Sequence, residues 1–264
     1  MRFDTLDPNV RSDWLTIGSA SLLDGCTADR PMATRLLGNH LQAWRDAAAL
    51  PVVIADGQSL PVLERYGYLW VHTGDGPQRT LFELPEYDES GRRIVDCGGI
   101  GVATSGLRVV ENFLDMGHFP YIHTGKLGKV PLTEVVPYRV HVDAATQEIW
   151  ALDCHFFQPR ASACAADGID AQYRYRVMQP FTAALYKSSP DHAGALDVIG
   201  LFVQPLDDEH VIAHVLLVYF EDRLGDADMI AFQHMIFGQD KPILENQRPR
   251  RLPLHGPLEA HMRC

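Results

Sequence analysis

The sequence predicts an α+β protein in which a helix-grip antiparallel sheet domain follows a small all-β unit. Three observations favour this class. Runs of alternating apolar and polar residues dominate the first third of the chain, a segment with helical spacing begins near residue 106, and six strand-like runs then precede a long helical stretch. We expect residues 1–96 to form the β unit and residues 97–264 to form the larger domain.

The elements are predicted in chain order from these patterns. Strands with intervening turns are expected over residues 14–24, 33–46 and 63–75. Val109, Val110, Phe113, Leu114 and Gly117 recur at helical spacing, and Pro120 should end that helix near Gly117 and His118. Six strands are then expected over residues 134–142, 147–157, 172–178, 181–187, 195–204 and 210–220.

The last element, residues 225–247, is predicted to form one or two helices. Asp226 is a suitable N-cap for it, and Pro242 could mark a break or a restart. Helices at both ends of a run of strands are typical of a sheet wrapped around a helix.

Composition excludes several classes of protein. The 264 residues carry a formal charge of −11, which argues against nucleic acid as a partner. No apolar run has the length of a membrane span, and the first residues lack the apolar core of a signal peptide, so we expect a cytoplasmic protein. The cysteines are irregularly spaced without a C-x-x-C pair, which disfavours a disulfide framework or a zinc ribbon: Cys26, Cys97, Cys154, Cys164 and Cys264.

A candidate metal site lies in the stretch "VVENFLDMGHFPYIHTG", residues 109–125. His118 and His123 are five residues apart, so one helical face does not present both, but they could chelate a metal if the helix breaks at Pro120. Neutral imidazole binds iron, zinc, copper and nickel. Asp115 lies three residues before His118 and could accept a hydrogen bond from its second ring nitrogen. A pair of histidines alone remains a weak indication.

Two histidines need an anionic third ligand to hold Fe(II) with open positions for O₂. Asp240, in "FGQDKPILENQRP", is the best candidate, although the pattern equally allows it to be the N-cap of a helix starting at Lys241. His210 and His214 lie in a predicted strand about 13 Å apart, which is too far to share one metal.

These motifs resemble those of Rieske-type non-haem iron oxygenases. "ENFLDMGHFPYIH" matches the N-x-x-D-x-x-H-x-x-x-x-H motif of their catalytic domain, and "QDKPILENQRPRRLP" is similar to their second motif. The resemblance implies that His118, His123 and Asp240 bind Fe(II). It also implies that Asp115 bridges His118 to a neighbouring Rieske centre and that Asn112 lies near the iron outside its ligand set.

The chain departs from the family at the Rieske cluster. That cluster needs C-x-H and C-x-x-H pairs, and no cysteine here is followed by such a histidine. Only "AALPVVIADGQS" lies where the family carries both pairs. The resemblance therefore implies a reduced, vestigial Rieske-like first domain without a [2Fe–2S] cluster. Electrons from reduced nicotinamide would come through a companion oxygenase subunit or a reductase that carries a Rieske centre, in a trimeric or mixed hexameric ring.

The function expected from this resemblance is that of the catalytic iron subunit of an O₂-dependent monooxygenase. N-demethylation of a purine-like heterocycle such as a methylxanthine, with release of formaldehyde, is the first expectation. O-demethylation or ring hydroxylation of an aromatic acid is the alternative. Two other functions are alternative hypotheses: a non-catalytic structural subunit of a mixed ring, and a zinc hydrolase that would work without O₂ or reductant.

Overall fold

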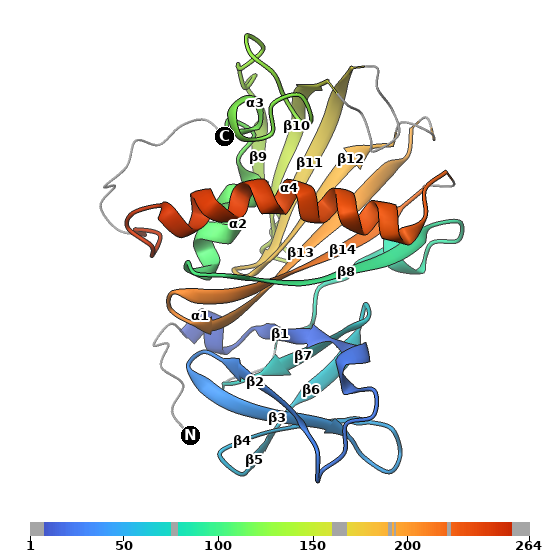
Figure 1. The fold of residues 1–264 in the computed structure, drawn as a ribbon, viewed down its shortest axis with the longest axis vertical. Coiled ribbons are helices and arrows are strands. Elements are labelled where there is room, and N and C mark those ends of the chain that lie inside the picture. The colour runs from blue at the N-terminus through green and yellow to red at the C-terminus, as the bar shows by residue number, and fades with distance from the viewer. Residues whose placement is uncertain are drawn as a thin grey trace.

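A seven-stranded antiparallel sheet forms the larger part of the molecule, and two small sheets form the rest (Figure 1). The structure is a computed structural model that describes residues 8–74, 79–159, 168–189, 192, 194–220 and 223–254. Cys164 and Cys264 lie outside the described residues. The described residues form mostly antiparallel sheet and few helices, as the sequence predicted.

The smaller unit precedes the large sheet. It contains the three-stranded sheet β1-β7-β6 and the four-stranded sheet β2-β3-β4-β5. A short helix α1 (Pro8–Arg11) is followed by β1 (Trp14–Ser19), β2 (Met32–Leu36), β3 (Asn39–Arg45), β4 (Pro51–Ala55), β5 (Gln58–Leu60), β6 (Val62–Arg65) and β7 (Tyr68–His72). The strand expected over 14–24 is shorter than predicted, because the 3₁₀ helix η1 (Ala20–Leu23) takes over after Ser19.

Two of the predicted strands are hairpins. Strands β2 and β3 form a hairpin over the range expected at 33–46, and β6 and β7 form one over the range expected at 63–75, each beginning one residue earlier than expected. Between β6 and β7 the turn residues Tyr66 and Gly67 have φ angles of 56° and 76°. Positive φ at both positions gives the tight turn whose twist matches antiparallel strands. The alternation of residues predicted the strands but not this reversal.

The large sheet has the strand order β8-β14-β13-β12-β11-β10-β9. Its strands are β8 (Arg93–Val102), β9 (Arg139–Val142), β10 (Ile149–Gln158), β11 (Ile169–Gln179), β12 (Thr182–Ser188), β13 (Leu196–Asp207) and β14 (His210–Tyr219). The strand expected over 134–142 is confirmed only from Arg139, because Pro137 has no N–H to donate to a neighbouring strand. Strand β8 spans the boundary that the sequence placed between residues 96 and 97. The short 3₁₀ helix η2 (Pro85–Asp88) precedes it.

The helices differ from the predictions at two prolines and at one N-cap. Helix α2 (Gly106–Leu114) ends well before Pro120, which instead lies in the first turn of α3 (Phe119–Ile122), where its missing N–H costs no hydrogen bond. Helix α4 (Asp226–Asn246) continues through Pro242, and its N-cap is Gly225 rather than Asp226. Buried residues on both sides of Pro242 anchor the helix to the sheet, which keeps it continuous: Phe237 and Leu244.

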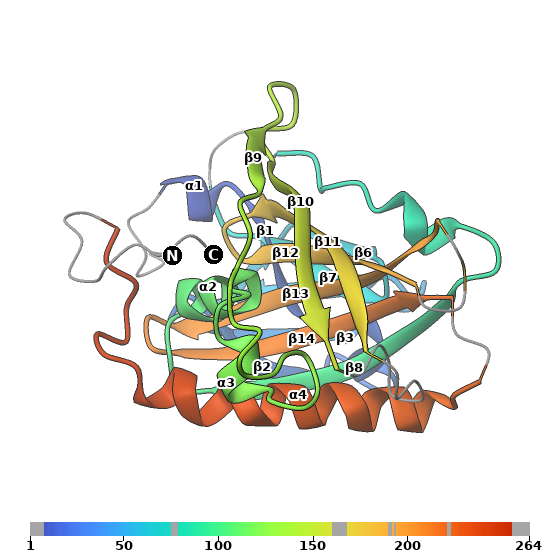
Figure 2. The same ribbon diagram turned by 90° about the horizontal axis from the view of Figure 1, so that it is seen from above.

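Helix α4 runs along the large sheet, and the smaller unit lies below that sheet in the view of Figure 1 (Figures 1 and 2). Each face of the sheet packs in a separate hydrophobic core. One face packs against α2 and α4 through residues such as Val109, Phe237 and Leu201. The opposite face packs against aromatic residues of the smaller unit, among them Trp70, which contacts Phe202. The two layers position α2, α3 and α4 over one side of the sheet, where the candidate site lies. None of the helices in the described ranges combines the length and apolarity that crossing a membrane requires.

Candidate metal centre

The segment between α2 and α3 brings the two histidines together. Helix α2 ends at Leu114, and the Gly117 N–H donates to Asp115 Oδ1 at 2.7 Å, which closes a tight turn. His118 then caps the N-terminus of the single-turn helix α3, and His123 caps its C-terminus. Because one helical turn separates them, the two imidazoles meet, with their Nε2 atoms 3.1 Å apart. The helical segment is interrupted before Pro120, and this interruption lets His118 and His123 meet although they are five residues apart.

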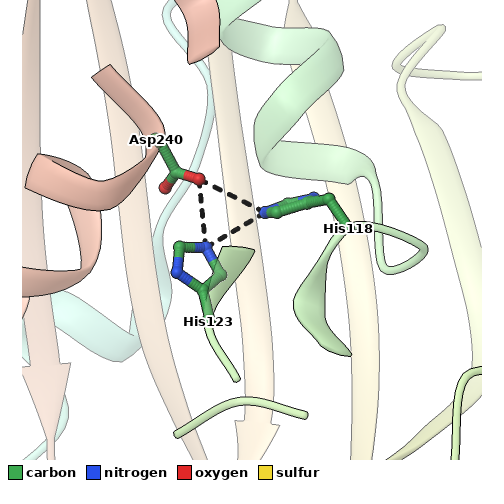
Figure 3. Close-up of side chains that lie close together, drawn as sticks. All are labelled: His118, His123 and Asp240. Atoms are coloured by element: carbon green, nitrogen blue, oxygen red, sulfur yellow. Dashed lines mark hydrogen bonds and ion pairs between the residues drawn. The ribbon is translucent and has the colours of Figure 1, made fainter. Parts of the chain in front are cut away.

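Asp240 comes from the middle of α4 and completes a triad (Figure 3). Its Oδ1 lies 3.0 Å from His123 Nε2 and 3.4 Å from His118 Nε2. The alternative in which Asp240 begins a helix as its N-cap is wrong, because α4 starts fourteen residues earlier at Asp226. Within the described residues this is the group of His, Cys, Asp and Glu whose donor atoms converge closely enough for one metal ion.

Hydrogen bonds on the far side of each imidazole orient the rings. His118 Nδ1 lies 3.2 Å from Asp115 Oδ2, and His123 Nδ1 lies 2.9 Å from Gln239 Oε1. An N–H on each Nδ1 donates to these oxygens, which leaves both Nε2 lone pairs facing Asp240. Gln239 was not among the predicted residues. Its position beside Asp240 in the chain is the signal that could have indicated it.

The donor set fits a divalent cation. Two imidazole lone pairs and a carboxylate oxygen repel one another unless a proton or a metal lies between them, and Asp240 Oδ1 is buried without a hydrogen bond of good geometry. Two donors at about 2.1 Å from one ion and at right angles to each other are about 3 Å apart, close to the separations seen here. Two histidines and one carboxylate on one side of an ion leave its other positions open.

Electrostatics at the triad show how strongly it attracts positive charge. Burial lowers the pKa of His118, but hydrogen bonds with Asp115 and Asp240 outweigh this and raise it to about 9. Burial raises the pKa of Asp240, whereas the two histidines lower it below its usual value. The electrostatics of the triad therefore favour a positive charge at the point where the three donor atoms meet.

A cavity opens beside the triad between α2, α4 and the sheet. Its walls are mainly apolar, with Phe113, Phe119 and Leu185 among them, and His118, His123 and Asp240 lie in one wall. Asn112 also lines the cavity, whereas Asp115 lies outside it. Such a mostly apolar cavity with a few polar groups is typical of a small-molecule site. The lining residues from β10 to β14 were not predicted.

The remaining predicted groups lie elsewhere. His210 is exposed beside Asp207, and His214 is buried with Nε2 3.2 Å from Gln204 Oε1. Neither contributes to the triad. Cys26, Cys97 and Cys154 are free thiols.

Comparisons with known proteins place this geometry in a family context. A family model for the vanillate O-demethylase oxygenase C-terminal domain matches residues 102–264, which include the triad. The probable methylxanthine N7-demethylase NdmC of Pseudomonas sp. (strain TJI-51) is 45% identical over 256 residues, 97% of this chain and 89% of that protein. The methylxanthine N1-demethylase NdmA of Pseudomonas putida is 27% identical over 195 residues, which are 72% of this chain and 53% of that protein.

A solved structure shares the fold. The structure of NdmB from Pseudomonas putida CBB5 superimposes with a TM-score of 0.77 at 18% sequence identity. The match covers 96% of this chain and 87% of that chain, so it includes the smaller unit as well as the large sheet. At this identity the likeness shows a common fold.

Proposed function

Because this chain belongs to the family of Rieske-type oxygenases that includes the vanillate O-demethylase oxygenase domain and the methylxanthine N-demethylases, we propose that it is the catalytic iron subunit of an O₂-dependent N-demethylase. The observation that carries the proposal is the convergence of His118, His123 and Asp240 on one point at the wall of a cavity. A purine-like methylated heterocycle is the proposed substrate, since the 45% identical relative is named for methylxanthine N7-demethylation.

The residues have separate tasks in this proposal. His118, His123 and Asp240 would hold Fe(II), and Gln239 would keep His123 in the tautomer that binds metal. When bound, iron supplies the activation of O₂ that lets a C–H bond be oxidised at neutral pH. The apolar wall residues Phe113 and Phe119 would exclude water and hold the flat substrate with its N-methyl group toward the triad.

The overall reaction balances with two electrons from outside the chain. An N-methyl group, O₂, two electrons and two protons give an N-hydroxymethyl group and water. The C–N bond of that product then breaks, and formaldehyde leaves while the ring nitrogen regains a proton. Since the sequence contains no C-x-H pair, we propose that a companion subunit or a reductase supplies the electrons from reduced nicotinamide through its own Rieske centre.

Asp115 is placed to take part in that transfer. Its carboxylate contacts His118 on the side away from Asp240, and its side chain is partly exposed. We propose that it accepts a hydrogen bond from a partner's cluster ligand in a trimeric or mixed hexameric ring. We also propose that the smaller unit is a reduced Rieske-like domain, which is supported by the structural match that extends over it.

Replacement of Asp240 tests the proposal against its alternatives. After anaerobic reconstitution we expect one Fe(II) per chain in the wild type, with [2Fe–2S] absorption only after a partner is added. Asp240→Ala should lose the iron and all formaldehyde release from methylxanthines while still assembling with its partners. Asp228→Ala, which removes an exposed carboxylate from the same helix, is the matched control and should behave as the wild type.

Other outcomes identify the other functions. Full turnover by Asp240→Ala would make the chain a structural subunit, and activity without O₂ or reductant would indicate a zinc hydrolase. The family model is named for vanillate O-demethylation, so release of formaldehyde from an O-methylated aromatic acid, and not from methylxanthines, would favour the O-demethylase function.

A further inference from the structure

The part of the cavity wall formed by the end of β10 and the first half of β11, here called the polar end, carries polar groups that the proposed chemistry does not use. Gln158 on β10 and Tyr173 on β11 both line the cavity, and their exposed fractions are only 1% and 2%. Among the residues that the structure describes, neither Gln158 Oε1 nor the Tyr173 hydroxyl makes a hydrogen bond of good geometry. A buried acceptor and a buried hydroxyl without partners destabilise the protein, so they point to a ligand that satisfies them.

The register of the sheet explains why this end is polar. Tyr173 lies directly opposite Lys187 on β12, and Lys187 lies directly opposite Asp197 on β13. Directly opposed residues of antiparallel strands share one face. The adjacent row, Tyr175, Leu185 and Ile199, contributes two aliphatic side chains to the cavity wall. The cavity floor therefore changes from apolar to polar within one row.

The polar end offers no net charge. Burial lowers the pKa of Lys187 to about 8, and attraction to Asp197 opposes this shift. The formal charges of the two side chains cancel, so a carboxylate that faced the Gln158 oxygen would find no uncompensated positive charge beside it. Burial raises the pKa of the Tyr173 phenol, and interaction with the Gln158 amide lowers this pKa by a smaller amount, so Tyr173 stays neutral. The group that fits is neutral and both accepts and donates.

One aromatic ring, Phe119, contacts both the polar end and the triad. Phe119 lies 6.0 Å from His123 and 6.4 Å from Tyr173, measured between ring centroids. A bicyclic heterocycle with its substituents is long enough to extend along such a pair of contacts. One edge of the ligand can therefore reach Tyr173 and Gln158 while a methyl group at its other edge faces the triad.

We propose that Tyr173 and Gln158 determine substrate specificity by binding a lactam edge, a carbonyl next to a ring N–H, of a neutral heterocycle. The Tyr173 hydroxyl donates to the carbonyl oxygen, and Gln158 Oε1 accepts from the ring N–H. Methylation of that nitrogen removes the donor and leaves the buried amide oxygen unpaired. This inference rests on the proposed function, because it assumes that the substrate occupies this cavity.

Equilibrium binding without turnover tests the inference. The Fe(II)-loaded protein is titrated anaerobically, without reductant, with 7-methylxanthine and with caffeine, which carries methyl groups on both nitrogens of the six-membered ring. We expect 7-methylxanthine to bind roughly tenfold to hundredfold more tightly. The two dimethylxanthines that keep one of these N–H groups identify the edge that is bound.

Each residue should leave a different signature in this titration. Gln158→Met, which keeps the shape but removes the acceptor, should reduce the preference for 7-methylxanthine to about threefold or less. Tyr173→Phe should weaken all the purines by about tenfold and keep the preference, because each of them retains its carbonyl groups. Tyr175→Phe is the matched control, since Tyr175 stacks beside Tyr173 but lines a different cavity, and it should change neither value.

The outcomes separate this inference from the proposed function. Equal affinity of the wild type for 7-methylxanthine and caffeine, or an undiminished preference in folded Gln158→Met, overturns the specificity assignment even if formaldehyde is released with a partner reductase. Tighter binding of an aromatic carboxylate than of any purine overturns it as well. The expected preference without any formaldehyde release would support the polar end as a binding site and count against the demethylase function.

Discussion

Replacement of Gln239 by leucine should weaken metal binding without unfolding the protein. Gln239 Oε1 accepts a hydrogen bond from His123 Nδ1 at 2.9 Å, and His123 is only 1% exposed, so water has no access to replace the lost acceptor. Leucine has nearly the volume of glutamine and cannot accept a hydrogen bond. The imidazole N–H of His123 would then be left buried and unpaired.

Two independent magnitudes agree for this change. An unpaired buried donor costs about 1–3 kcal/mol. Loss of a group that orients a metal-binding histidine lowers metal affinity by about tenfold to hundredfold, which corresponds to about 1.4–2.7 kcal/mol. The penalty falls mainly on the metal-bound state, because only there must His123 keep its proton on Nδ1. We therefore expect the Kd for Fe(II) to rise by about tenfold to hundredfold.

Anaerobic competition with a chromophoric chelator measures this Kd. Gln239→Glu keeps the acceptor and should bind Fe(II) at least as tightly as the wild type. Gln233→Leu is the matched control, because it makes the same replacement on the same helix at a residue that lines the cavity, and its Kd for Fe(II) should be unchanged. A folded Gln239→Leu protein with a Kd within about twofold of the wild type would refute the reasoning.

Two further predictions concern packing and pH. A Cβ at Gly128 would lie 2.7 Å from the backbone nitrogen of Pro120, inside α3, so Gly128→Ala should displace the histidine pair and weaken Fe(II) binding by about tenfold, whereas Gly101→Ala, with open space around it, should have no effect in the same titration. Burial lowers the pKa of His214 from 6.5 to about 4, with the Asp96 carboxylate opposing this shift. The unfolded chain therefore binds a proton at higher pH than the folded one, and this stabilisation is lost as the pH falls from about 6.5 to about 4. Between pH 7.5 and pH 5, the free energy of unfolding measured in urea should fall by about 2 kcal/mol more in the wild type than in His214→Gln. An equal fall in both proteins would contradict this prediction.

Local pattern and tertiary packing contributed differently to the description of the helices. The spacing of apolar residues predicted α2 and α4 because it depends only on the helical period within one segment. It did not predict that α4 continues through Pro242, because packing of Phe237 and Leu244 on the sheet holds the helix on both sides of the proline. The same continuity makes Asp240 a residue of the helix interior.

The sequence by itself determined the candidate metal ligands and the absence of a cluster motif. His118 and His123 are identified by residue type and short spacing, and Asp240 by the resemblance of its own segment to a known motif, so neither inference depends on how the rest of the chain packs. Only the tertiary structure decided that Gln239 orients His123 and that Tyr173 and Gln158 line the cavity. These relations depend on strand register and on the docking of α4 against residues more than a hundred positions away. No local period carries that information, because long-range contacts are set by packing of the whole core.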